Sequence, residues 1–387
     1  MKKDEAFDRP PERRGTGSLK WDLYDQGDTL PFWVADMDFE SPPEVTAALQ
    51  ERVAHGVFGY GYAKASEKEA VLAYLLRRHG LQVPGNWLLW QPGLVPALSV
   101  AAETAKRRGA KSALVCAPVY PPFLKCPDDG GLESLAVSLC QEASGRWTFD
   151  RDAMEACVRP DTGLFILCNP HNPVGTVFRR EELEWLGEFC QRHDLLLCSD
   201  EIHCDLIMDD EATPHVSVLH LSESLQNRSM VLMAASKTYN TAGLGCAYAI
   251  IPSVELRTAY RQAAGGWVPP VNVLGYTATA AAYEHGEPWR QRLLAYLREN
   301  HSVLKEHMQR YHPNIDVTPV EATYLAWLDV RALGLERPMA YFQKHGLTLS
   351  NGEDFGARGY LRWNVGCSRA LLEDGLERFT KATAAMA

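Results

Sequence analysis

The sequence predicts an α/β protein built around a mostly parallel sheet. Three short apolar runs, at residues 114–117, 164–168 and 195–198, each end in a polar turn. These runs do not alternate polar and apolar side chains, so they indicate strands buried on both faces, as in parallel sheets. Leucine and phenylalanine recur at helical spacing within residues 180–193, between the second and third runs. A strand, helix, strand unit is therefore expected there.

Two more apolar runs, at residues 230–235 and 247–251, extend this sheet. In open α/β sheets, ligands bind beyond the carboxyl ends of the strands. Lys237, Asp200 and Asn172 all follow such strand ends. We therefore expect the functional site to include these three side chains.

The pattern changes near residue 285. Residues 287–310 predict an amphipathic helix, and residues 324–330 and 360–365 predict strands. This pattern of elements indicates a smaller α+β domain, in which the residues after about 285 should pack with the first 45 residues. The predicted division is a large domain at 46–285 and a discontinuous small domain at 1–45 and 286–387.

Composition excludes several classes of protein. The 387 residues include 39 Lys and Arg against 49 Asp and Glu, which gives a formal charge of −10. No basic block is present to neutralise a phosphate backbone, so nucleic acid is not an expected partner. Hydrophobic residues make up 46% and charged residues 23%, as in globular domains.

The sequence also predicts a cytoplasmic protein without a membrane partner. No run of 18 apolar residues occurs, and the charged start has no apolar signal region. The ten cysteines never form a C-x-x-C pair and are too sparse for a disulfide scaffold. No His or Cys pair near residue 171 has structural-zinc spacing, so we expect no metal.

Two ionisable residues carry the strongest chemical signal. Lys237 directly follows an apolar strand, where a desolvated amine titrates low enough to act as a nucleophile. Taken alone, it could also be a solvated turn lysine. Asp200 at a strand end would need a cationic partner, which a protonated pyridine nitrogen could supply. It could equally cap the following helix.

Two loops add weaker signals. Asn172 lies in a turn with two prolines and a glycine, which is either a rigid loop or a device that aims the amide at a ligand oxygen. Gly93 precedes a helix-like stretch that runs through Ala105. Free amides at that helix start could bind a phosphate.

Taken together, the ordered motifs resemble the fold-type I pyridoxal-phosphate enzymes of the class I/II aminotransferase group. The motifs are Asn169-Pro170-His171-Asn172-Pro173-Val174-Gly175, Ser199-Asp200-Glu201, Ser236-Lys237-Thr238 and Arg362-Trp363-Asn364. Features at residues 33–39, 55–60, 200–203 and 366–369 look like the MalY/PatB branch of cystathionine β-lyases and C–S lyases. The resemblance covers nearly the whole chain. It implies an aspartate aminotransferase-like fold, with a seven-stranded-type sheet flanked by helices, and pyridoxal 5′-phosphate as the cofactor.

The resemblance assigns three principal roles. Lys237 would carry the cofactor covalently and later move the Cα proton of the substrate. Asp200 would keep the pyridine nitrogen protonated, so that the ring can accept electrons. Arg362 would clamp the substrate α-carboxylate with its planar fork.

The resemblance also implies contacts to the cofactor ring. Asn172 would hydrogen-bond the ring hydroxyl, His203 would lie near it, and Tyr120 would stack on the ring face. Many aminotransferases of this group carry a tyrosine where this chain has His203, and an arginine where it has Gly245. Both departures favour the lyase branch.

The phosphate contacts extend to a second subunit. The amides of Leu94 and Val95, helped by Ser236, would hold the phosphate. Tyr60 would reach a phosphate in the other subunit, which implies a homodimer with its active site at the interface.

The expected reaction is cleavage of cystathionine, or a related cysteine S-conjugate, to a thiol such as homocysteine, pyruvate and ammonia. One alternative is an aminotransferase, because the same residues serve both reactions. Another is a lyase-fold protein with an additional regulatory binding role.

Overall fold

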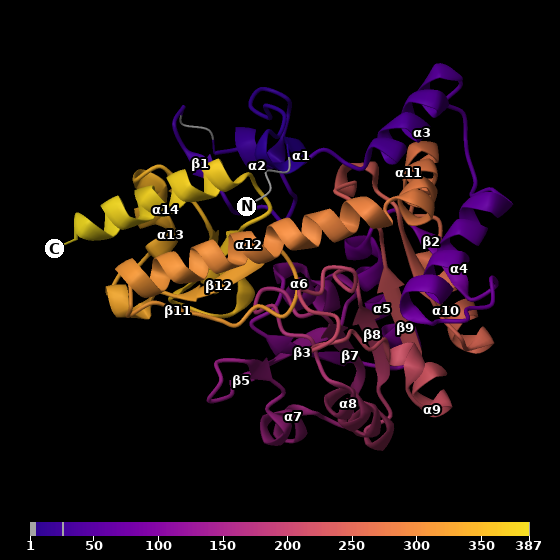
Figure 1. The fold of residues 1–387 in the computed structure, drawn as a ribbon. Coiled ribbons are helices and arrows are strands. Elements are labelled where there is room, and N and C mark those ends of the chain that lie inside the picture. The colour runs from indigo at the N-terminus through magenta and orange to yellow at the C-terminus, as the bar shows by residue number, and fades with distance from the viewer. Residues whose placement is uncertain (1–4, 25–26, 387) are drawn as a thin grey trace.

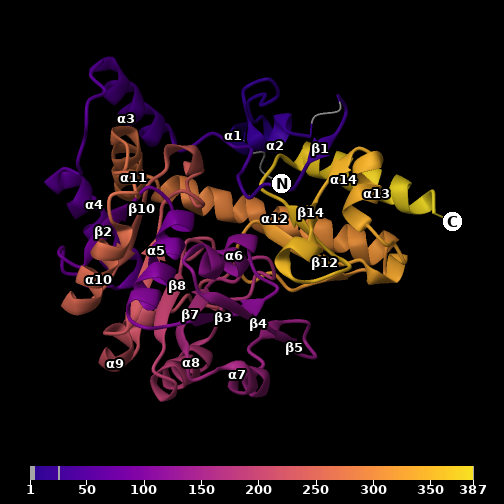
Figure 2. The ribbon, with the colours of Figure 1, turned by 180° about the vertical axis from the view of Figure 1, so that it is seen from behind.

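Residues 5–24 and 27–386 are described by the computed structural model of the chain, shown from two sides in Figures 1 and 2. A large body built on one sheet lies beside a smaller body built on another. The 25-residue helix α12 (Glu287–Tyr311) runs from the first into the second.

The large sheet has seven strands in the order β2-β10-β9-β8-β7-β3-β4. Four neighbouring pairs are parallel, and β10 is antiparallel to both of its neighbours. The expected mostly parallel sheet is therefore confirmed. Its strands are β2 (Leu88–Gln91), β3 (Ser112–Ala117), β4 (Glu133–Ser138), β7 (Thr162–Cys168), β8 (Leu196–Asp200), β9 (Ser229–Met233) and β10 (Ala247–Ile250).

Helices cover both faces of this sheet because successive strand residues point to opposite sides. Leu164 and Ile166 of β7 belong to one core, with α5 and α10, whereas Phe165 and Leu167 belong to a second core, with α4, α8 and α11. The three layers explain why the apolar runs do not alternate. The helices around the sheet are α3 (Pro43–Ala54), α4 (Ala65–His79), α5 (Leu94–Arg107), α6 (Pro121–Asp129), α7 (Arg151–Cys157), α8 (Arg180–Arg192), α9 (Glu223–Gln226), α10 (Val254–Ala264) and α11 (Val273–His285).

The smaller sheet is antiparallel, with the order β11-β12-β15-β14. Its strands are β11 (Asp316–Val317), β12 (Leu325–Asp329), β14 (Ser350–Asn351) and β15 (Tyr360–Asn364), and its helices are α12, α13 (Pro338–Lys344) and α14 (Arg369–Ala384). The helix and the two strands predicted after residue 285 are confirmed. Short two-stranded pairings join β1 (Leu30–Pro31) with β13 (Leu347–Thr348), and β5 (Cys140–Gln141) with β6 (Trp147–Thr148).

The start of the chain packs on its C-terminal third. Strand β1 pairs in parallel with β13, and α1 (Glu5–Asp8) and α2 (Leu19–Asp22) lie beside these elements. The Phe7 ring lies 5.6 Å from that of Trp289 and 5.4 Å from that of Tyr296. The exact division into domains at residues 45 and 285 stays a prediction.

The chain's cysteines are all free, and eight of the ten are buried. None of the helices in the described part of the chain is both long enough and apolar enough to span a membrane.

Replacing Gly352 by Ala should destabilise the protein. This glycine follows β14, and an added Cβ would collide with the backbone carbonyl oxygens of Ala357 and Tyr360. Overpacking of this kind costs about 1–3 kcal/mol. Urea unfolding should show a lower midpoint with an unchanged slope.

Gly266→Ala is the matched control, because nothing lies within 4 Å of its Cβ position. It should change the free energy of unfolding by about 0.5 kcal/mol or less. Equal midpoints for the two variants would contradict the steric argument.

Candidate active site

A cavity of about 310 Å³ lies at the carboxyl edge of the large sheet. The turns that follow β2, β3, β7, β8 and β9 all reach it, because the carboxyl ends of parallel strands meet at one edge. The predicted residues that line it are Leu94, Val95, Tyr120, Asn172, Asp200, His203, Ser236 and Lys237. Arg362 adjoins this group through Asn172, whereas Tyr60 is not among the lining residues.

Lys237 is a desolvated amine. Its Nζ donates to the carbonyl oxygen of Ala35 at 2.6 Å. Burial, and to a smaller extent the Arg362 cation, lower the pKa of Lys237 to about 8, although Asp36 and Asp200 oppose the shift. Near neutral pH, Lys237 is therefore the free nucleophilic amine far more often than an ordinary lysine, and its burial rules out the solvated-turn interpretation.

Asp200 ends β8 with its carboxylate facing the cavity. Its Oδ1 accepts a hydrogen bond from the Ile202 N–H at 3.0 Å. Burial raises the pKa of Asp200 to about 7, against the opposing effects of Ile202 and Lys237. Within the described chain no ion pair to this carboxylate is found, so a cationic group in the cavity could pair with it directly.

His203 lies three residues after Asp200 and is 2% exposed. Its Nδ1 is buried and has no hydrogen-bond partner among the described residues. Burial, together with Lys237 and Arg362, lowers the pKa of His203 to about 3. The ring is therefore neutral at physiological pH, and it can accept or donate one hydrogen bond to a ligand in the cavity.

Arg362 and Asn172 form one hydrogen-bonded unit. Arg362 Nη1 donates to Asn172 Oδ1 at 2.9 Å, and Nη2 donates to the Trp33 carbonyl oxygen at 2.7 Å. The guanidinium lies 4.7 Å from the centre of the Phe355 ring. Burial lowers the pKa of Arg362 to about 10, a value that leaves it charged at neutral pH.

The N-terminal end of α5 offers backbone donors. The first N–H groups of a helix have no intrahelical acceptor, and Gly93 before the helix supplies no side-chain cap. Leu94 and Val95 begin this helix, and Ser236 lines the same cavity. Gly245 also lines the cavity, at φ +54°, where a Cβ would lie 2.9 Å from the Pro92 carbonyl oxygen. The close approach explains why glycine stands there.

Tyr60 lies on an exposed segment away from the cavity. The segment joins α3 to α4 and runs along the outer edge of the molecule in Figure 1. Tyr60 is fully exposed, and Val57, Phe58 and Tyr62 are 61%, 61% and 83% exposed. A contact between Tyr60 and the cavity of its own chain is absent from the described structure.

Several residues of the site were not predicted from the sequence. Ala35 lines the cavity, and the Tyr324 hydroxyl donates to the same Ala35 carbonyl at 2.8 Å. Asn240 and Asn364 bind the backbone on either side of Ala35. The motif at residues 33–39 indicated that this segment matters. Its contacts, however, are made with residues about 200 to 330 positions away in the sequence, which no local pattern predicts.

A buried ionic group lies behind the site. The ligand atoms of His79, Cys204 and Asp205 lie within 4.8 Å of one another, a grouping that the spacing analysis did not foresee. His79 Nε2 is 3.0 Å from Asp205 Oδ1. Although burial raises it, His79, Arg290 and Arg78 lower the pKa of Asp205 to about 2. Because three basic side chains already surround this acid, the group is better explained as an ion-pair cluster than as a metal centre.

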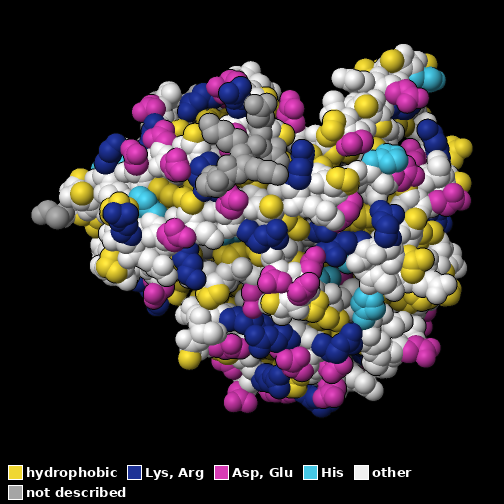
Figure 3. All heavy atoms as spheres, viewed as in Figure 1, with side chains coloured by type: hydrophobic (Ala, Val, Ile, Leu, Met, Phe, Trp, Pro, Cys, Tyr) yellow, Lys and Arg dark blue, Asp and Glu magenta, His cyan; other side chains and the backbone are white. Residues whose placement is uncertain are grey.

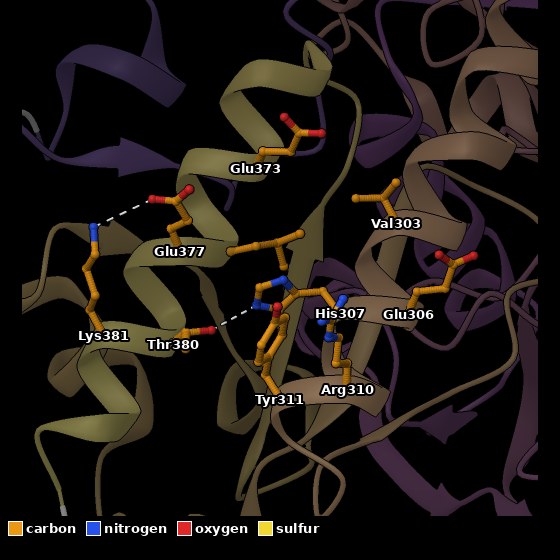
Figure 4. A pocket seen from close by; sticks show the side chains of 10 residues that line it. Val303, Glu306, His307, Arg310, Tyr311, Glu373, Glu377, Thr380 and Lys381 are labelled. Atoms are coloured by element: carbon orange, nitrogen blue, oxygen red, sulfur yellow. Dashed lines mark hydrogen bonds and ion pairs between the residues drawn. The ribbon is translucent and has the colours of Figure 1, made fainter. Parts of the chain in front are cut away.

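A larger hollow, of about 600 Å³, lies between α12 and α14 (Figure 4). His307 Nε2 contacts Thr380 Oγ1 at 2.8 Å, and Lys381 lies 3.6 Å from Glu377. This hollow is remote from the strand ends and contains none of the predicted site residues. The smaller cavity is therefore the candidate active site.

In the protein without added ligand, the rate at which an amine-reactive acylating reagent modifies Lys237 should rise with pH, with a midpoint near 8. Mass spectrometry of the modified peptide measures this rate, with exposed Lys381 as the internal reference for the reagent. Arg362→Gln should raise the midpoint, because it removes the cation that lowers the pKa of Lys237. An unchanged midpoint in this variant would contradict the electrostatic coupling of the two residues.

Comparisons with known proteins agree with this geometry. The chain is 38% identical over 392 residues to the cystathionine beta-lyase PatB of Bacillus subtilis, a match that covers 97% of this chain and 99% of PatB. The crystal structure of OvoB has a TM-score of 0.94 and 41% identity, and the match covers 98% of this chain and 99% of OvoB. Cystalysin from Treponema denticola, whose structure contains pyridoxal 5′-phosphate, has a TM-score of 0.92 and 29% identity, with 98% and 99% covered.

The family model for aminotransferase class I and II matches residues 28–379. This range contains every element of the large sheet and the predicted site residues at its edge. The chain therefore belongs to the aminotransferase class I and II family.

Proposed function

We propose that this protein is a pyridoxal 5′-phosphate-dependent C–S β-lyase that cleaves cystathionine or a related cysteine S-conjugate. The observation that carries the proposal is the meeting of Lys237 and Asp200 in one cavity, with Arg362 hydrogen-bonded to the lining residue Asn172. Relatives support it, since PatB is named a cystathionine beta-lyase and cystalysin contains pyridoxal 5′-phosphate.

The residues of the cavity fit this cofactor. Asp200 is a buried carboxylate that forms no direct ion pair within the described chain, which suits a protonated pyridine nitrogen. The unpaired Nδ1 of His203 and the amide of Asn172 suit a ring oxygen. The amides of Leu94 and Val95, at the positive end of α5, suit a phosphate, with Ser236 beside them. Tyr120 lines the same cavity and suits a ring face.

The chain's own residues divide the chemistry among them. Pyridoxal phosphate, when bound, draws the electron pair left at the substrate Cα into its ring. Arg362 binds the substrate carboxylate and so fixes the orientation of the Cα–H bond. Lys237 accepts the Cα proton, a role that suits an amine with a pKa near 8. Loss of the β-thiolate and uptake of water then give thiol, pyruvate and ammonia.

A lyase and an aminotransferase differ in what they need. An aminotransferase must pass the amino group to a keto acid, whereas β-elimination returns the cofactor to its starting form. Gly245 and His203 replace the arginine and the tyrosine that many aminotransferases carry. Gly245 lines the cavity, so the loss of the positive charge of that arginine lies within the site itself.

The purified holoenzyme should release pyruvate from cystathionine without any added keto acid. A coupled lactate dehydrogenase assay measures pyruvate, and a thiol reagent measures homocysteine in equal amount. Lys237→Ala should lower kcat by about 10⁴-fold or more, because the variant lacks the proton carrier and the amine that holds the cofactor. Strict dependence on a keto acid would favour the aminotransferase.

We further propose a homodimer in which Tyr60 completes the site of the partner subunit. The exposed side chains of Val57, Phe58, Tyr60 and Tyr62 support it, because a run of four large apolar side chains is unusual on a free surface. Helix α3 next to this segment projects from the body and carries further apolar side chains (Figure 3). The hydroxyl of Tyr60 would then supply one donor to a phosphate at α5.

Mixing two inactive variants tests this arrangement. Tyr60→Ala and Lys237→Ala dimers, unfolded together and refolded, form mixed dimers in which one site has both residues. Statistical mixing should restore about one quarter of wild-type activity if each site takes Tyr60 from its partner. A mixture that stays at the level of the Tyr60→Ala variant alone would contradict a shared site.

Two broader features belong to the same proposal. The division into a large domain at 46–285 and a small domain at 1–45 and 286–387 is supported by the pairing of β1 with β13. A cytoplasmic location is supported by the ten free cysteines, which suit a reducing compartment.

A further inference from the structure

Residues 32–39 form an extended segment, here called the strap, that passes between the large sheet and the smaller sheet. The strap contains no strand or helix, yet nearly every one of its carbonyl groups accepts a hydrogen bond. Most of the donors are side chains that lie more than 190 positions away in the sequence. Arg13 and Lys20, nearer in sequence, add bonds to Met37 O and Asp36 O. The strap is therefore held mainly by side chains from the two ends of the site, with support from the N-terminal segment.

One set of bonds comes from the lysine side. Lys237 Nζ donates to Ala35 O at 2.6 Å. Three residues later, Asn240 Nδ2 donates to Met37 O at 2.9 Å and to Phe39 O at 2.7 Å, and Asn240 Oδ1 accepts from Met37 N at 3.0 Å. One amide side chain thus uses both of its N–H groups and its oxygen on the strap.

The other set comes from the arginine side. Arg362 Nη2 donates to Trp33 O at 2.7 Å. Two residues later, Asn364 Nδ2 donates to Val34 O and to Asp36 O, both at 2.6 Å. Asn364 is fully buried, and its Oδ1 accepts from the Gly366 N–H at 2.7 Å, so its amide orientation is fixed.

Asn240 holds its position in an unfavourable backbone conformation. Its φ is +55°, in the left-handed region that non-glycine residues seldom adopt. Asparagine tolerates this region better than most residues, and such conformations persist where the surroundings impose them. The hydrogen bonds to Met37 and Phe39 are the contacts that require an amide side chain at this place.

We propose that Asn240 and Asn364 are positioning residues, which hold the strap as a fixed link between Lys237 and Arg362. Asn240 sets the lysine end, and Asn364 sets the arginine end, with Ala35 O between them. The distance between the amine that moves the Cα proton and the guanidinium that holds the carboxylate then depends on the strap. This inference rests on the proposed function for its catalytic consequence, but not for its effect on Lys237.

Asn240→Gly is the sharpest test, because glycine adopts a positive φ freely and the change removes only the side-chain bonds. Asp194→Gly is the matched control: Asp194 also has a positive φ, of 52°, and its side chain is 98% exposed beyond α8. Both variants relieve the same kind of backbone strain, but only the first touches the strap.

In the protein without cofactor, Asn240→Gly should raise the pH midpoint for acylation of Lys237 above the wild-type value near 8. The reason is that a loosened strap admits water, and burial is the largest cause of the lowered pKa of Lys237. Asp194→Gly should leave the midpoint unchanged. A wild-type midpoint in Asn240→Gly, whatever its thermal stability, would overturn the proposal.

In the holoenzyme, Asn240→Gly should lower kcat by about tenfold to a hundredfold with a smaller change in KM, as expected for a misplaced proton carrier. Asn364→Ala should act mainly on KM for substrates with an α-carboxylate. Because both residues act through one strap, the loss of kcat/KM in the double variant should be smaller than the product of the single losses. Full multiplicativity would overturn the link between the two ends.

Two outcomes separate this inference from the proposed function. If the wild-type enzyme makes no pyruvate from any cysteine S-conjugate, the proposed function fails, while the acylation experiment still decides the role of Asn240. If the enzyme is active and Asn240→Gly behaves as Asp194→Gly does, the proposed function stands and the strap inference fails. Should Asn364→Ala not fold, Asn364→Ser supplies the arginine-end variant, since its hydroxyl keeps one donor.

Discussion

Side-chain hydrogen bonds to the backbone of residues 32–39 join the two halves of this molecule at its site. The large sheet delivers Lys237 and the smaller sheet delivers Arg362, and neither sheet alone fixes the distance between them. Arg362 donates a hydrogen bond to the Trp33 carbonyl oxygen, and Lys237 donates one to the Ala35 carbonyl oxygen. Buried backbone carbonyls must be paired, so the segment cannot leave this place without exposing or orphaning them. The geometry of the cavity therefore depends on a piece of chain that belongs to no regular element.

Burial sets the charges of the site. It lowers the pKa of Lys237, His203 and Arg362, and it raises that of Asp200. All four shifts favour the neutral form, which is the general effect of removing water from an ionisable group. Their size differs because the neighbours differ: Asp36 and Asp200 partly support the charge of Lys237, whereas His203 faces only cations. Although the chain has a formal charge of −10, the guanidinium of Arg362 stays charged beside the cavity at neutral pH.

Much of the sheet and of its polar edge could be predicted because the signals are local. An apolar run followed by Asn172, Asp200 or Lys237 shows where a strand ends, and parallel strands bring such ends together. The antiparallel direction of β10 could not be predicted, because strand direction depends on connections rather than on the residues of the strand. Asn240 and Tyr324 escaped notice for a similar reason: each acts on a backbone group about 200 to 290 positions away. Tyr60 differs again, since one chain cannot reveal a contact made with another, and its role stays a prediction.

The cysteines of the cavity have a bearing on the proposed product. Cys168 and Cys246 line the space in which a thiol would be released. Burial raises the pKa of both side chains, and the thiolate is the form that attacks disulfides and other electrophiles. Six further cysteines are buried elsewhere in the protein, and burial raises the pKa of each of them as well. Thiol–disulfide exchange with small sulfur compounds is correspondingly slow at these positions. If the proposed reaction is correct, the fold thus keeps these cysteines from forming mixed disulfides with the sulfur compounds that enter the cavity.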